Sequence, residues 1–189
     1  MTDPSNHIYW ITSRAAGTIA MVLASFAVMA GLMMGMKFTR GKRAGDLRVT
    51  HEVLSLATLF AIAVHAFVLL GDNFLRPSLV DLLVPFQGQQ NEFWFSIGII
   101  GGWLLMILGL SYYVRSYIGQ ARWRALHRFS ALAWIMAVGH SLGQGTDAGE
   151  GWFLALTAVV VIPPALLLIA RMSGFGADRS QGSTLETSA

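Results

Sequence analysis

Four long stretches of this 189-residue chain contain no Asp, Glu, Lys or Arg. They are residues 15–36, 53–71, 93–114 and 152–170. Each is close to the roughly 20 apolar residues that an α-helix needs to cross a bilayer. A shorter run, 129–143, reaches a similar length if Trp123, Ala125 and Leu126 lie at the membrane interface. The sequence therefore predicts an all-α membrane protein, a bundle of about five transmembrane helices.

Basic residues predict the orientation of this bundle. They gather in the connections 37–52 and 115–128, whereas the connections 72–92 and 144–151 are mainly acidic. Basic loops stay in the cytoplasm, so we expect the N-terminus outside and the C-terminus inside, in a multi-pass protein of a bacterial inner membrane. The net charge of +3 is then a consequence of membrane topology, and no nucleic-acid partner is expected.

The chain is predicted to form one domain, residues 8–171, followed by a disordered cytoplasmic tail, 172–189, rich in Gly, Ser and Thr. Within the connection 72–92, Ser78 and Asp81 have the spacing of a helix capping box. This pair predicts a short amphipathic helix on the outer surface, with a plain hydrophobic loop as the alternative.

Four of the five histidines lie in two of the predicted spans, where ionisable groups are costly and usually functional. His51 and His65 are 14 residues apart, and His127 and His140 are 13 apart. At about 1.5 Å per residue, each pair spans about 20 Å along its helix. Both helices are expected to run outward, so His51 and His127 share the inner level and His65 and His140 share the outer level.

Two histidines from neighbouring helices suit the axial positions of a haem iron. Zinc would require about four ligands close together, and the chain has no cysteine to supply them. We therefore expect two b haems, of which one site could be empty. Interhelical hydrogen bonds alone would explain a single buried histidine, but not four at two matched depths. The fifth histidine, His7, is expected to be a surface residue.

The 13-residue spacing fits this hypothesis less well than the 14-residue spacing. At about 100° per residue, 14 residues return to within roughly 40° of the same helix face, whereas 13 leave a mismatch of about 140°. Helix tilt, an irregularity near Gly139 or differently oriented haems could absorb that mismatch.

Haem propionates are anionic, so arginines at the right depth are candidate partners. Arg48 and Arg128 lie near the inner histidines, and Arg14 enters the outer end of the first span. Topology or snorkelling would explain the inner two equally well.

Several segments resemble the ferric reductase-like transmembrane domain family. This family includes the membrane cores of NADPH oxidases, eukaryotic ferric reductases and the haem subunit of a bacterial methionine sulfoxide reductase system. The likeness covers roughly residues 8–171 and rests on residues 9–17, His51 to Phe67, Asp81 to Phe86, Trp123 to Arg128, and His140. The resemblance implies that His51 with His127, and His65 with His140, ligate two stacked haems.

One feature departs from the large members of that family, which continue into a cytoplasmic module for FAD and NAD(P)H. Fewer than 20 residues follow the last predicted span here, and no dinucleotide fingerprint occurs. We therefore expect an electron-transfer subunit of a reductase system, with no catalytic residue of its own. Its donor would be a flavin reductase or a membrane quinol, and its acceptor a molecule or redox subunit on the outer face. The alternative is a cation or proton transporter that uses the histidines as a relay.

Overall fold

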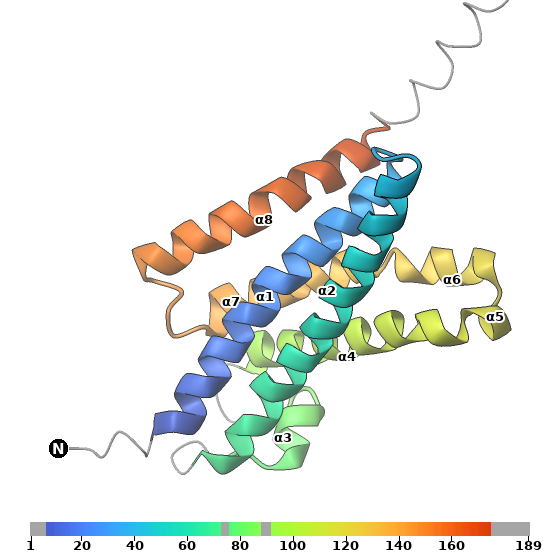
Figure 1. Ribbon diagram of the computed structural model, residues 1–189. Coiled ribbons are helices and arrows are strands. Elements are labelled where there is room, and N and C mark those ends of the chain that lie inside the picture. Colours follow the sequence, from blue (N-terminus) through green and yellow to red (C-terminus); the bar gives the residue numbers. More distant parts are fainter. Residues whose placement is uncertain (1–6, 73–75, 88–91, 175–189) are drawn as a thin grey trace, which may run out of the picture.

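The structure is a computed structural model that describes residues 7–72, 76–87 and 92–174, and these residues contain helices and no strand (Figure 1). The predicted tail, 172–189, lies almost entirely outside the described residues. In chain order the helices are α1 (Ile8–Gly35), α2 (Lys42–Phe67), η2 (Val68–Gly71), α3 (Leu79–Leu83), α4 (Glu92–Leu110), η3 (Ser111–Val114), α5 (Arg115–Ile118), α6 (Gln120–His127), α7 (Ser130–Gln144) and α8 (Gly151–Met172).

Helix α1 is the centre of the bundle and packs against α2, α7 and α8. Its buried face is made mostly of alanines, including Ala16, Ala20, Ala24 and Ala27. Small side chains let membrane helices approach closely and gain van der Waals contact. On the α8 side, Met21 packs against Phe153 and Val160. Helices α4 and α7 pack together as a second pair beside this group.

Four helical segments are long and apolar enough to cross a membrane: α1, Lys42–Gly71, Phe93–Ile118 and α8. Their outward side chains are apolar and exposed, as with Phe60 and Val159, each 72% exposed. Exposed apolar area on this scale marks a surface that contacts lipid. The prediction of an all-α membrane bundle is thus confirmed for four spans.

The fifth predicted span is divided into two helices. Helix α6 has 8 residues and α7 has 15, so neither alone has the length of a membrane-spanning helix. Together they run back alongside η3 and α4, from the α5–α6 turn towards the α7–α8 connection (Figure 1).

The basic connections and the acidic connections lie at opposite ends of the bundle (Figure 1). The α1–α2 turn, the α5–α6 turn and the end of α8 are at one end, and α3 and the α7–α8 connection are at the other (Figure 1). The first end carries the basic connections and the second carries the acidic ones. We refer to them as the inner and outer ends, following the orientation expected from the charges.

The short helix predicted in the outer connection is confirmed as α3. The Ser78 hydroxyl accepts from the Asp81 amide at 3.2 Å, and the Ser78 amide donates to the Asp81 carboxylate at 2.8 Å, which completes the capping box. Two bonds attach this segment to α4: the Trp103 indole donates to the Leu83 carbonyl at 2.9 Å, and the Phe86 amide donates to the Ser96 hydroxyl at 2.8 Å.

Candidate functional site

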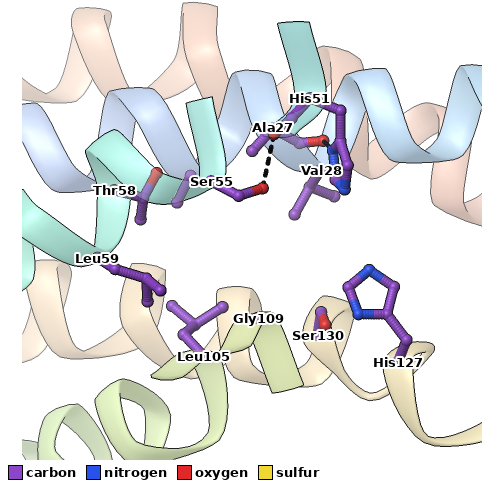
Figure 2. Close-up of a pocket in the computed structure, with 11 residues that line it drawn as sticks. Ala27, Val28, His51, Ser55, Thr58, Leu59, Leu105, Gly109, His127 and Ser130 are labelled. Atoms are coloured by element: carbon purple, nitrogen blue, oxygen red, sulfur yellow. Dashed lines mark hydrogen bonds between the residues drawn. The ribbon is translucent and has the colours of Figure 1, made fainter. Parts of the chain in front are cut away.

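The four membrane histidines form two facing pairs between α2 and the α6–α7 segment. The ring centroids of His51 and His127 are 6.2 Å apart, and those of His65 and His140 are 6.1 Å apart. Figure 2 shows His51 and His127 pointing towards each other from opposite sides of a gap. The structure therefore brings together the same pairs that the spacing predicts. His7 is exposed beside the start of α1, as expected.

A break between α6 and α7 explains how a 13-residue spacing places both rings towards α2. Helix α6 ends at His127 and α7 begins at Ser130. Between them the Phe129 amide donates to Leu126 at 2.9 Å and the Ala131 amide to Arg128 at 3.3 Å. These bonds span three residues instead of four, which is the tighter 3₁₀ pattern, and they change the phase of the helix. The irregularity expected near Gly139 is wrong in position, because α7 is continuous there.

Three of the histidine rings are held by carbonyls of a neighbouring helix. The acceptors for Nδ1 are Ala27 for His51 at 2.8 Å, Ser13 for His65 at 2.8 Å and Trp94 for His140 at 2.9 Å. A carbonyl at Nδ1 selects the tautomer that carries its proton there, and Nε2 is then left as a lone-pair donor. Interhelical hydrogen bonds therefore exist, as the simpler explanation of the histidines requires, but they occupy only one nitrogen of each ring.

Glycines make room for the same three rings, and the sequence reasoning missed them. A Cβ at Gly17 would lie 2.8 Å from Nδ1 of His65, and one at Gly31 would lie 3.2 Å from Cε1 of His51. A Cβ at Gly98 would collide with the ring of His140. The sequence does contain a pattern that indicates two of these glycines. Gly17 and Gly31 are 14 residues apart, which is the same spacing as that of His51 and His65 on the antiparallel helix α2.

A small cavity of about 60 Å³ opens between His51 and His127. Its remaining walls come from α1, α2, α4 and α7 and are mainly small or apolar (Figure 2). They include Ala24, Val28, Leu59, Leu105 and Gly109. The inner pair thus faces a small space with mainly apolar walls.

The middle of the bundle is closed between the two histidine levels. Trp134 is 2% exposed, and its indole donates to the hydroxyl of Ser25 at 3.0 Å, joining α7 to α1. On α2, Thr58, midway between His51 and His65, is also buried. The two histidine pairs are therefore separated by packed side chains.

The histidine pairs can serve a metal only as two-ligand sites. Among the residues that the structure describes, no group of three or more His, Cys, Asp or Glu side chains is placed to hold an ion. This arrangement does not fit the four ligands of structural zinc. It fits haem iron, for which the porphyrin supplies the other ligands.

The spacing of the rings would allow each pair to hold one metal ion between its two rings. A metal–nitrogen bond of about 2 Å on each side, plus about 1.1 Å from nitrogen to ring centre, places the centroids about 6.2 Å apart. The two observed separations are 6.2 and 6.1 Å.

The three arginines predicted to meet propionates have different environments. Arg14 forms an ion pair with Asp147 in the α7–α8 connection and lies over the Trp10 ring, 4.2 Å from its centroid. Arg48 donates to the Tyr112 hydroxyl at 2.8 Å, and Arg128 is exposed in the turn after His127. Arg14 therefore already has a carboxylate partner within the chain, and a propionate role for any of the three stays a prediction.

Comparison with protein-family models, with curated proteins and with solved structures finds no match to this chain.

Proposed function

We propose that this chain is a di-haem b-type electron-transfer protein of the ferric reductase-like kind. The inner haem would be held by His51 and His127 and the outer haem by His65 and His140. A bound haem supplies reversible one-electron chemistry at its iron. The observation that supports this proposal best is the separation of the ring centroids, 6.2 and 6.1 Å, in two pairs at two depths.

The protein's own contribution is to hold four nitrogen ligands in place before the cofactor arrives. Carbonyls at Nδ1 of His51, His65 and His140 fix three ring orientations. The glycines behind these rings limit one direction of movement, because a ring that already contacts the neighbouring backbone cannot move closer to it. The apolar walls exclude water, and a low dielectric setting influences the potential of a bound haem.

The partners follow from the orientation. Basic connections at the inner end support a bacterial inner membrane with that end in the cytoplasm. Electrons would then pass from a flavin reductase or a membrane quinol to an acceptor or redox subunit on the outer face. In this proposal α6 and α7 together cross the membrane as the fifth span.

A histidine relay for protons or cations has less support. Such a relay needs free polar groups between the two levels, and α2 offers Glu52 and the hydroxyls of Ser55 and Thr58 there. The Glu52 carboxylate accepts from the Tyr113 hydroxyl at 3.3 Å. The Ser55 hydroxyl donates to the carbonyl of His51 at 2.7 Å, and the Thr58 hydroxyl donates to that of Leu54 at 2.8 Å. Both hydroxyls thus donate within their own helix.

The deciding experiment is a reduced-minus-oxidised absorbance spectrum of the purified protein, with haem counted as the pyridine haemochrome. We expect a b-type spectrum and about two haems per chain. His65→Ala should lose one haem and keep the other, while the matched surface variant His7→Ala should keep both. Absence of haem after expression with ample haem supply would overturn the proposal and favour the relay.

A further inference from the structure

A groove runs beside the contact between α1 and α2 in the inner half of the bundle. The two helices meet where Nδ1 of His51 lies 2.8 Å from the carbonyl of Ala27. The adjacent side chains of the same two helices enclose a space of about 230 Å³, larger than the cavity between His51 and His127. Its lining residues are Phe26, Met29, Ala30 and Met33 of α1, and Leu47, Thr50 and Leu54 of α2.

The groove has apolar walls and opens to the membrane. Phe26 and Thr50 are exposed, so the space is reached from the surface of the bundle. The Thr50 hydroxyl donates to the carbonyl of Asp46 at 2.9 Å, within its own helix. Ala30 is buried, and its short side chain leaves room between Phe26 and Met33, which lie about one turn away on the same face. Such a surface suits a hydrocarbon chain, because a polar ligand would lose its hydrogen bonds to water there.

Positive charge gathers at the inner end of the groove. Residues 37–48, which include the α1–α2 turn, carry five basic side chains and one acidic side chain at this end of the bundle (Figure 1). On α2, Arg43 precedes the three lining residues by 4, 7 and 11 positions, which are the intervals that place side chains on one helix face. Lys37 lies just beyond the end of α1. Both side chains are exposed, so both are free to meet a ligand at the inner end of the groove.

The length of the groove matches the thickness of one leaflet. Leu54 follows Arg43 by 11 residues. At about 1.5 Å per residue this is about 16 Å along the helix. The hydrocarbon core of a bilayer is about 30 Å thick, so one leaflet contributes about 15 Å. A lipid with its phosphate at Arg43 would therefore have its acyl chain beside the whole groove.

The charge selects among the lipids that could occupy the groove. Basic residues at this end follow from membrane topology alone, and the chain of any phospholipid could enter an apolar groove. Here, however, the apolar positions and Arg43 share one face of α2. An anionic head group is favoured at that face, because a zwitterionic head group brings a positive charge of its own.

We propose that this groove binds an acyl chain of an anionic phospholipid from the leaflet at the inner end, and that Arg43 and Lys37 bind its phosphate group. The site lies on the lipid-facing surface, outside the two histidine pairs, so this inference does not depend on the proposed haem function. A lipid bound to the folded chain would stabilise the packing of α1 against α2 beside His51.

The test is native mass spectrometry of the full-length protein, with phosphatidylglycerol or phosphatidylcholine of identical chains added to the detergent micelles. We expect phosphatidylglycerol to bind about tenfold more tightly or better. Arg43→Gln and Lys37→Gln should each weaken phosphatidylglycerol binding about fivefold and leave phosphatidylcholine binding unchanged. Arg122→Gln, at an exposed arginine of α6 at the same end, is the control and should change neither.

A bulky side chain tests the groove without a change of charge. Thr50→Trp should fill the groove and remove the bound phosphatidylglycerol. Val49→Trp, at an exposed neighbouring position outside the lining, should retain it, and circular dichroism checks that both variants fold.

Three results would overturn the inference. The two lipids could bind the wild type equally, Arg43→Gln and Arg122→Gln could have the same effect, or Thr50→Trp could retain the lipid. A dimer that dissociates in Thr50→Trp would also overturn it, because the groove would then be occupied by a second copy of the chain.

Discussion

Gly17 of α1 lies directly against the imidazole of His65 on α2, where an added Cβ would come within 2.8 Å of Nδ1. The same relationship recurs one level further in, between Gly31 and His51, at 3.2 Å from Cε1. Because α1 and α2 are antiparallel neighbours, equal spacings along the two helices keep both contacts in register. Each ring is thereby pressed against backbone and directed towards the opposite histidine.

Gly17→Ala should displace His65 and reduce the content of the outer haem. Overpacking of this kind costs about 1–3 kcal/mol. Gly31→Ala, with the longer approach, should have a smaller effect on the inner haem. The control is Gly102→Ala, whose Cβ would meet Ile62 at 3.7 Å, an ordinary contact. Haem per chain and thermal unfolding in detergent measure the effects, and full haem content in Gly17→Ala would contradict this account.

The ion pair between Arg14 and Asp147 should stabilise the attachment of the α7–α8 connection to α1. The Asp147 side chain is only 16% exposed, and Nε of Arg14 lies 3.1 Å from its Oδ2. A double-mutant cycle with Arg14→Gln and Asp147→Asn should give a coupling of roughly 1 kcal/mol, at the upper end for pairs that water still reaches. Glu150→Gln, at an exposed carboxylate nearby, is the control and should cost little.

The same cycle decides whether Arg14 binds a propionate. If it does, haem loading should draw Arg14 away from Asp147 and reduce their coupling. An equal coupling with and without haem would leave Arg14 as a purely structural residue.

The capping box of α3 should respond to pH through Asp81. Hydrogen bonds from the backbone amide of Ser78, then from its hydroxyl, lower the pKa of this carboxyl. The stabilisation is therefore complete above the ordinary pKa of an aspartate and is lost as the pH falls through the lower folded value. Ser78→Ala should raise the pKa of Asp81, read by carbon NMR of the carboxyl group, whereas Ser78→Thr should preserve it. An identical pKa in the wild type and Ser78→Ala would exclude the hydroxyl as a cause.

The hydrogen bond between Trp134 and Ser25 should contribute more to the free energy of unfolding than other hydroxyl hydrogen bonds in the bundle. Ser25→Ala leaves the buried indole N–H without its acceptor, which costs about 1–3 kcal/mol. The double variant with Trp134→Phe should be little less stable than Trp134→Phe alone, because the two residues share one interaction. Ser141→Ala, whose hydroxyl donates to its own helix at Ala137, is the control. Chemical unfolding in detergent measures all four, and additive losses would contradict the prediction.

The sequence by itself determined the features that depend on local chemistry. Charge-free runs determined the four membrane helices, because a spanning helix must satisfy its backbone internally and expose apolar side chains to lipid. Ser78 and Asp81 determined the start of α3, since both partners of a capping box lie within one turn. The spacing of the histidines determined their two depths, because the rise of a helix per residue is constant.

Only the tertiary structure decided which way the histidine rings point. The break at Arg128 and Phe129 rotates His140 towards α2, and nothing local in the sequence marks that position as a break. The pairing of Arg14 with Asp147, 133 residues away in the chain, likewise depends on which helices pack together. The importance of Gly98 also depends on tertiary packing, because it follows only from the contact of this glycine with the ring of His140. Contacts between distant segments depend on how whole helix faces pack together. The sequence indicates such a contact only where two antiparallel helices repeat the same spacing, as Gly17 and Gly31 do with His65 and His51.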